Sequence, residues 1–186
     1  MQAIFHGLAF DTDPGRVFSP RPTTEKLVDA ALARLGPRPA RVADIGTGSG
    51  VIAVTLALRA PHVEVWASDT CRRALAVAAA NAERLGAQVH LVAGDLLEGI
   101  PRDLDLIVAN LPYLPSDASG YDDEPPAAVF STGDGLGHYR RLLAEAADHL
   151  APDGGLIIQF EGEVLEAERD ELPWLRARLE SLRAAA

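Results

Sequence analysis

Short apolar runs and helical patterns alternate along the chain, and this alternation constrains the fold more than any other feature of the sequence. The apolar runs are typical of strands, and they occupy residues 41–45, 63–68, 89–93, 104–109 and 155–160. Helical patterns lie between them, near residues 50–60, 71–85 and 137–150. Strands without polar alternation are covered on both faces, as in a parallel sheet with helices on either side. The sequence therefore predicts an α/β fold with a doubly wound, mostly parallel sheet, in which ligands bind beyond the carboxyl ends of the strands.

The length of 186 residues predicts a single domain. We expect it to consist of an N-terminal arm (1–22), a core (23–162) and a C-terminal helical tail (163–186). The arm contains three prolines and is typical of an extended segment or a small hairpin. The core should begin with a helix over residues 23–35, with Thr23 or Thr24 as its N-cap and Gly36 as its stop.

Charge and cysteine content narrow the class of protein. A net charge of −10 argues against a nucleic-acid-binding surface spread over the whole molecule. The single cysteine, Cys71, cannot form an intramolecular disulfide, which fits a reducing compartment. No apolar run approaches the length of a membrane span, and the N-terminus lacks the layout of a signal peptide. The sequence predicts a cytoplasmic protein without membrane contact, and its five scattered histidines predict no metal site.

A glycine-rich turn, VADIGTGSGV, joins the first core strand to the following helix. Its glycines let the backbone turn tightly and approach a ligand closely. A dinucleotide-binding motif needs glycine or alanine where this chain has Val51, so the spacing favours a nucleoside ligand without a pyrophosphate. The residues of this turn that we expect to bind a cofactor are Asp44, Gly46, Thr47, Gly48, Ser49 and Gly50.

Two further acids stand at the ends of the next strands. Asp69 follows the glycines by about 20 residues, where a carboxylate can accept both ribose hydroxyls. Asp95 is placed to meet an adenine amino group, and Leu96 to pack on the adenine ring. Each acid alone is equally compatible with a helix N-cap. Because acids and glycines recur at successive strand ends, together they predict a cofactor site.

The fourth core strand runs directly into Asn110, Leu111, Pro112 and Tyr113. A planar NH₂ group is a poor nucleophile, and a site assists it by accepting hydrogen bonds from both of its N–H groups. The Asn110 side-chain oxygen and the Leu111 carbonyl supply two acceptors, Pro112 fixes the turn, and Tyr113 offers a flat face. The alternative is a proline-rich loop in which the asparagine caps a turn and Tyr113 packs on the surface.

The Asn-Leu-Pro-Tyr sequence resembles the Asn-Pro-Pro-Tyr motif of methyltransferases that act on amide or exocyclic amino nitrogens. Three flanking stretches resemble the protein-(glutamine-N5) methyltransferases that modify peptide-chain release factors, and they read FSPRPTTEKLVDAAL, EPPAAVFSTGDGLGHYRRLL and APDGGLIIQFEG. The similarity covers about residues 8–163. It implies a Rossmann-like class I methyltransferase fold and S-adenosyl-L-methionine as cofactor.

The resemblance also implies roles for particular residues. The cofactor would contact residues 46–50, Asp69, Leu96 and Asn110, and the acceptor amide would lie against residues 110–113. Arg21 and Thr24 would border the same pocket, and Asp134 and Gly135 would brace the neighbouring loop. The cluster Asp122 to Glu124 is expected to be a solvated loop tip.

The chain departs from this family in three places. Leu111 replaces the first proline of the motif, although a backbone carbonyl does not depend on its side chain. Because the match begins almost at Met1, we expect the chain to lack the helical domain that precedes it in the family, and we expect the C-terminus to be too short for two final strands. The fold is therefore expected to be shortened, leaving the edge of the strand at 155–160 bare. A bare edge invites pairing, so we expect a homodimer or a partner subunit there.

Three functions are compatible with the sequence. The leading interpretation is an S-adenosylmethionine-dependent N-methyltransferase acting on a glutamine amide of a protein such as a release factor. The second is the same chemistry on an amino group of a nucleic-acid base, which the acidic composition disfavours. The third is a cofactor-binding partner subunit without substrate recognition of its own.

Overall fold

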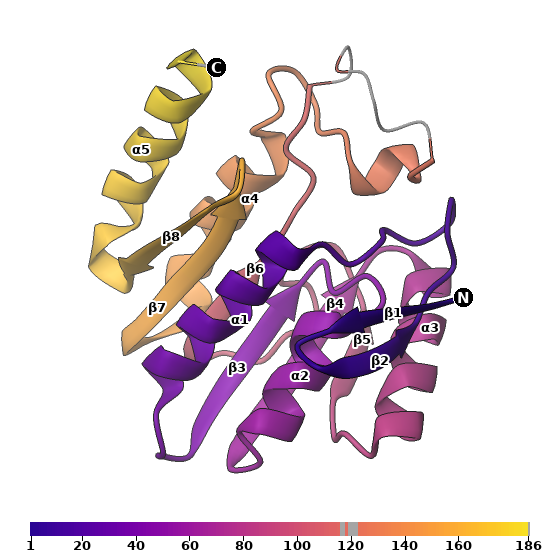
Figure 1. Cartoon of the computed structure of the whole chain (residues 1–186). Helices are drawn as coiled ribbons and strands as arrows, with labels where there is room; N and C mark the ends of the chain where they lie inside the picture. Colours follow the sequence, from indigo (N-terminus) through magenta and orange to yellow (C-terminus); the bar gives the residue numbers. More distant parts are fainter. Residues whose placement is uncertain (116–117, 119–122, 186) are drawn as a thin grey trace.

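A six-stranded sheet forms the centre of the molecule in the computed structural model, which describes residues 1–115, 118 and 123–185 (Figure 1). Its strand order is β5-β4-β3-β6-β7-β8. The strands are β3 (Ala40–Ile45), β4 (Val63–Asp69), β5 (His90–Ala93), β6 (Leu104–Ala109), β7 (Leu150–Phe160) and β8 (Glu163–Glu168). The first five strands in this spatial order pair in parallel with their neighbours, and β8 runs antiparallel to β7. This arrangement confirms the doubly wound, mostly parallel sheet.

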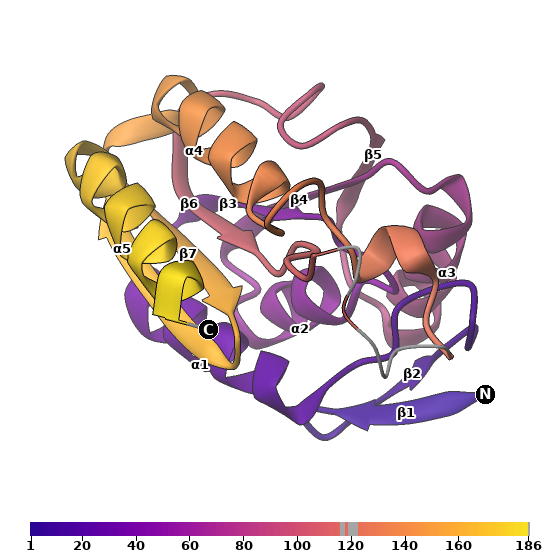
Figure 2. The same cartoon turned by 90° about the horizontal axis from the view of Figure 1, so that it is seen from above.

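Helices cover both faces of the sheet, as Figure 2 shows from above. On one face, α1 (Pro22–Leu35), α2 (Val51–Arg59) and α3 (Arg72–Leu85) enclose one buried apolar cluster. On the other face, α4 (Gly137–His149) and α5 (Leu172–Ala185) enclose a second cluster. Central strands such as β6 are buried along almost their whole length, which explains their unbroken apolar sequence. No helix among the described residues is both long and apolar enough to span a membrane.

The N-terminal arm forms a hairpin of β1 (Gln2–Phe5) and β2 (Leu8–Asp11), one of the two forms expected for it. Phe5 and Phe10 are buried in the cluster that α1 and α2 share. The buried Asn81 on α3 accepts a hydrogen bond from the Asp11 N–H at 2.7 Å and donates one to the Ser49 carbonyl at 2.9 Å. The hairpin is thereby tied to the glycine-rich turn.

The start of α1 differs from the expectation. Its N-cap is Arg21, whose side chain makes no capping hydrogen bond, and Pro22 is the first helical residue. Thr23 and Thr24 lie inside the first turn, because proline at the first helical position supplies a suitable φ angle and has no N–H to satisfy. The helix ends before Gly36, as predicted.

The C-terminal tail is not wholly helical, and the expectation of a bare edge at 155–160 is wrong. Residues Glu163–Glu168 form β8, which pairs along β7 from Gly155 to Phe160. A tight turn joins the two strands, with positive φ angles of 50° at Glu161 and 83° at Gly162. Arg34 of α1 donates two hydrogen bonds to the Glu168 carboxylate, at 2.7 and 2.6 Å, and so fixes the far end of β8. The stated reason for a homodimer or a partner subunit at this edge is therefore removed.

Candidate active site

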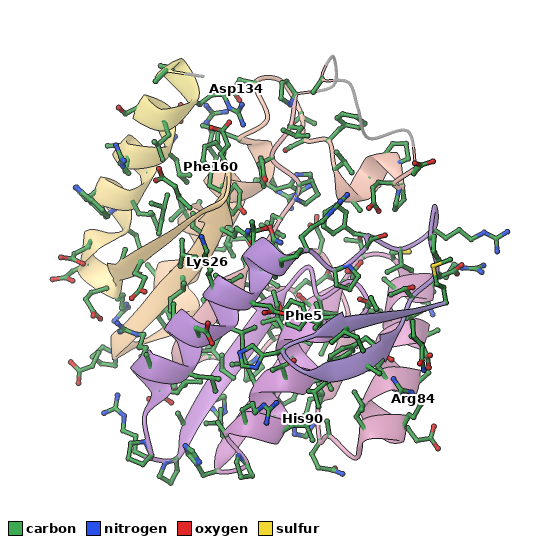
Figure 3. All side chains as sticks on the ribbon, viewed as in Figure 1. Phe5, Lys26, Arg84, His90, Asp134 and Phe160 are labelled. Carbon is green, nitrogen blue, oxygen red and sulfur yellow. The ribbon has the colours of Figure 1, made fainter. Side chains whose placement is uncertain are left out.

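A cavity of about 190 Å³ lies beyond the carboxyl ends of β3, β4 and β6. Most of the residues expected to bind a cofactor line it, namely Gly46, Thr47, Gly48, Ser49, Asp69, Asp95, Leu96 and Asn110, together with Leu111 and Pro112. Figure 3 labels Phe160 near this end of the sheet, whereas His90 marks the opposite end, where β5 begins. Asp44, Gly50 and Tyr113 do not line this cavity.

Two glycines of the turn lie close to other segments of the chain, Gly46 to the turn after β6 and Gly50 to α3. Gly46 has a φ angle of 74°, and a Cβ atom added there would lie 2.7 Å from the Leu111 side chain. Gly50 has a φ angle of 82°, and its Cβ would lie 2.9 Å from that of Ala78 on α3. Gly50 is therefore required for the close approach of α2 to α3, whereas a Cβ on Gly48 would meet open space.

Asp44 is fully buried beneath the turn. One of its carboxylate oxygens accepts hydrogen bonds from the Thr47 hydroxyl at 2.7 Å and the Ala53 N–H at 3.1 Å. The other oxygen has no partner among the described residues. Burial raises the pKa of Asp44 to about 7, because the charged form is poorly solvated there. Asp44 supports the cavity through Thr47 and does not face into it.

Asp69 holds the turn from the neighbouring strand. Its two oxygens accept hydrogen bonds from the Gly48 N–H at 2.9 Å and the Cys71 N–H at 2.8 Å. The N-cap of α3 is Cys71, so Asp69 is not the helix cap that sequence alone allowed. Each carboxylate oxygen has further lone pairs with which a hydroxyl group in the cavity can bond.

The third strand end provides one apolar and one charged residue. Leu96 is buried with a positive φ angle of 51°, and its carbonyl accepts a hydrogen bond from the buried Ser68 hydroxyl at 2.6 Å. Asp95 is more exposed and pairs with Arg141 of α4 at 2.7 Å. The cavity thus has a fixed apolar wall at Leu96, and Asp95 is already engaged by an arginine.

Asn110 is oriented by α1. Its side-chain NH₂ donates a hydrogen bond to the Thr24 hydroxyl at 3.1 Å, which leaves the amide oxygen on the other arm of the group. No described residue donates a hydrogen bond to that oxygen. A hydrogen-bond acceptor is therefore held at the wall of the cavity.

The backbone of Leu111 is fixed from the opposite face of the sheet. The fully buried Tyr139 hydroxyl accepts a hydrogen bond from the Leu111 N–H at 3.1 Å and donates one to the Gln159 carbonyl of β7. Burial raises the pKa of Tyr139, so its hydroxyl stays neutral. This hydrogen-bond bridge connects α4, β7 and the turn after β6.

Tyr113 lies beside a second, smaller cavity of about 60 Å³. Its ring packs on Phe160 with centroids 5.2 Å apart, and its carbonyl accepts a hydrogen bond from Arg183 of α5 at 2.6 Å. The two cavities share Phe18, Thr24, Asn110, Leu111, Pro112 and Ala128 as lining residues. The Asn-Leu-Pro turn therefore forms the central part of the wall between them.

Two hydrogen bonds to Glu124 anchor the segment after the turn. Glu124 is buried and accepts hydrogen bonds from Arg21 at 2.8 Å and from the Ser19 N–H at 3.1 Å. The expectation that it belongs to a solvated loop tip is wrong because these donors satisfy its charge, and Asp122 lies outside the described residues. Arg21 lines the second cavity, and Thr24 lines both cavities.

Known proteins similar to this chain include methyltransferases. A family model described as the methyltransferase small domain matches residues 9–122. The release factor glutamine methyltransferase of Bordetella pertussis is 43% identical, over 82% of this chain and 60% of that protein. The protein of the same name from Streptococcus pneumoniae is 36% identical, over 95% of this chain and 67% of that protein. The chain belongs to the release factor glutamine methyltransferase family.

The fold of this family member is also found in a solved methyltransferase. The crystal structure of a methyltransferase from Pyrococcus furiosus matches 91% of this chain and 75% of that one, with a TM-score of 0.64 and 20% identity. The Rossmann-like class I methyltransferase fold expected from the sequence is confirmed. The chain spans 60% and 67% of the length of the two curated relatives named above.

Asp134 and Gly135 have the structural role that resemblance to the family implied. Arg140 donates two hydrogen bonds to the Asp134 carboxylate, at 2.7 and 2.6 Å, and these bonds hold the pKa of Asp134 well below its usual range. A Cβ atom on Gly135 would collide with the Tyr113 carbonyl, and its φ angle is 93°. Asp134 thereby ties this loop to α4, and Gly135 lets it approach the Tyr113 carbonyl closely.

Sequence reasoning missed several residues of the site in this family member. His138 lines the first cavity and forms a hydrogen bond with the buried Ser131 hydroxyl at 2.7 Å. Burial lowers the pKa of His138, which favours its neutral form. Gln159 lines the second cavity, and its only sequence signal was a polar residue in the apolar run GLIIQF.

Proposed function

We propose that the chain binds S-adenosyl-L-methionine in the first cavity and transfers its methyl group to the side-chain amide nitrogen of a glutamine in a protein such as a peptide-chain release factor. The observation that carries the proposal is the wall between the two cavities. The amide oxygen of Asn110 stands in that wall with no donor among the described residues, while Thr24 fixes the orientation of the amide. The names of the curated relatives support glutamine as the acceptor.

The residues that line the first cavity fit a nucleoside that carries a sulfonium group. Asp69 offers carboxylate oxygens for ribose hydroxyls, Leu96 offers an apolar wall for a base, and Gly48 leaves space for close approach of the backbone. S-adenosyl-L-methionine, when bound, would supply a methyl group made electrophilic by its positive sulfur. We accordingly assign cofactor binding to Gly46, Thr47, Gly48, Ser49, Asp69, Asp95, Leu96 and Asn110, with Asp44 supporting the turn through Thr47 and Gly50 packing against α3.

The residues of the turn act on the acceptor nitrogen. Asn110 Oδ1 and the Leu111 carbonyl accept hydrogen bonds from its two N–H groups. These bonds direct the nitrogen lone pair toward the first cavity and stabilise the positive charge that develops on nitrogen. Pro112 and Tyr113 confine the planar amide. As the new N–C bond forms, the bond between methyl and sulfur breaks with its electron pair going to sulfur, and the nitrogen then releases one proton to water. This protein substrate would be met in the cytoplasm, where release factors act.

The deciding experiment incubates the purified chain with labelled S-adenosylmethionine and an unmethylated release factor. Mass spectrometry should locate one added methyl on a glutamine side chain. Asn110→Ala should lower kcat about 10²- to 10³-fold, the loss typical of a transition-state hydrogen bond, while cofactor affinity by calorimetry stays within a few-fold. If this variant had the same kcat as the wild type, the Asn-Leu-Pro-Tyr turn would have no role in methyl transfer.

A further inference from the structure

The second cavity contains a polar group that nothing in the fold explains. Gln159 lies near the end of β7, one residue before Phe160, and only 2% of its surface is exposed. Its backbone carbonyl is bound by Tyr139, as described above. Its side-chain Oε1 is buried and has no hydrogen-bond partner among the described residues.

An unpartnered buried amide is unfavourable for the free protein. Leu156, Ile157 and Ile158 precede Gln159 in β7, and an aliphatic residue at position 159 would continue this buried apolar run at no hydrogen-bonding cost. Gln159 lines the same cavity as Asn110 and Tyr113. A half-turn about the last side-chain bond exchanges its oxygen and its NH₂, so either arm can be presented to a ligand.

We propose that Gln159 is a substrate-binding residue that recognises the carbonyl oxygen of the acceptor carboxamide, an inference that rests on the proposed function. A primary carboxamide carries one carbonyl oxygen and two N–H bonds. Asn110 and the Leu111 carbonyl account for the N–H bonds and leave the carbonyl oxygen without a donor. The Gln159 NH₂ supplies that donor from a neighbouring strand of the sheet, since β6 and β7 pair side by side.

This pairing would select a carboxamide over a simple amine. A lysine amine has no carbonyl oxygen, so its entry would leave the Gln159 donor unpaired in a buried site. Recognition would therefore use three contacts, two on the acceptor nitrogen and one on the acceptor oxygen.

The test compares the wild type with Gln159→Met, which keeps a similar volume but has no amide. With a purified release factor as substrate, kcat/KM should fall about 10- to 100-fold, the loss expected for one buried hydrogen bond. Calorimetry should show unchanged S-adenosylmethionine affinity. The Tm of the free protein should stay level or rise by about 2–6 °C, because an unpartnered buried amide has been removed. A residue needed only for stability would show the opposite change in Tm.

Gln88→Met is the matched control, because Gln88 is exposed and does not line either cavity; it should leave transfer and Tm unchanged. Transfer by Gln159→Met at the wild-type rate would overturn the inference while leaving the proposed function intact. So would a drop in Tm, or a failure to fold, in both Gln159→Met and Gln159→Leu. If the wild type methylates no glutamine at all, the proposed function itself fails.

Discussion

At the scale of single residues, the site consists of polar side chains that are held by some of their hydrogen bonds and keep other hydrogen-bonding positions available to a ligand. Asn110 is anchored through its NH₂ and presents its oxygen, and Asp69 is anchored by two N–H groups and still lines the cavity. Sequence reasoning found these residues because strand ends of a parallel sheet converge. It did not find Tyr139 or Gln159, because their contacts depend on the register between β6, β7 and α4.

Removing the Asp69 carboxylate should weaken cofactor binding. We expect Asp69→Ala to cost about 1.5–3 kcal/mol of S-adenosylmethionine affinity, because hydrogen bonds to a charged group are lost. Titration calorimetry measures this, and Asp148→Ala, an exposed carboxylate on α4, is the control. The wild type should bind NAD much more weakly than S-adenosylmethionine, and tighter binding of NAD would refute the cofactor assignment.

The buried Asp44 should make stability depend on pH. Its pKa is raised by burial from an ordinary value of 3.8 to about 7. Between these values the folded protein holds a proton that the unfolded chain has lost, so this group's contribution to stability is greatest at low pH and is lost as pH rises through about 7. The Tm of the wild type should therefore fall more steeply than that of Asp44→Asn between about pH 5.5 and about pH 8. Parallel curves for the two proteins would show that Asp44 titrates normally.

At the scale of elements, the sequence predicted the parallel strands and their helices but not β8. The stretch EVLEAE is rich in good helix formers, and only residues 165–168 alternate between apolar and polar as a strand would. Its strand conformation comes from pairing with β7 and from burial of Leu165 and Ala167 against the α5 side of the sheet. Tertiary pairing overrode local propensity here. The helical character of this stretch, together with the expected lack of the family's two final strands, gave the wrong expectation of a bare edge.

Helix α5 should influence transfer through Arg183, a positioning residue. Arg183 donates a hydrogen bond to the Tyr113 carbonyl, pairs with Glu161 at 3.1 Å and lies over the Phe160 ring. Arg183→Met should lower kcat about 5- to 50-fold because the turn of residues 110–113 loses its support, and Arg183→Lys should restore part of that loss.

The affinity of Arg183→Met for S-adenosylmethionine should not change, because neither Arg183 nor Tyr113 lines the first cavity. Arg176→Met, at an exposed position of the same helix, is the control for a general loss of stability. If the two variants lose activity equally, the contact between Arg183 and Tyr113 has no special role.

At the scale of the whole molecule, the carboxyl ends of the strands hold two cavities, one on each side of a thin wall. The wall was predictable as a motif, because an asparagine, a proline and a tyrosine followed a buried strand. The separation into two cavities was not, since it also needs Phe18 from the N-terminal segment and Ala128 from the loop after the turn. These segments meet through the bond between Arg21 and Glu124, which joins residues far apart in the chain.

The two-cavity arrangement also has a consequence for kinetic order. Among the described residues, the side chains shared by both cavities include no thiol, amine or carboxylate that could carry a methyl group between them. Donor and acceptor must then be present together, and double-reciprocal plots at several fixed acceptor concentrations should give intersecting lines. Parallel lines would instead require a methylated protein intermediate. A methyl group made chiral with three hydrogen isotopes should accordingly reach the glutamine nitrogen with its configuration inverted, the outcome of a single displacement.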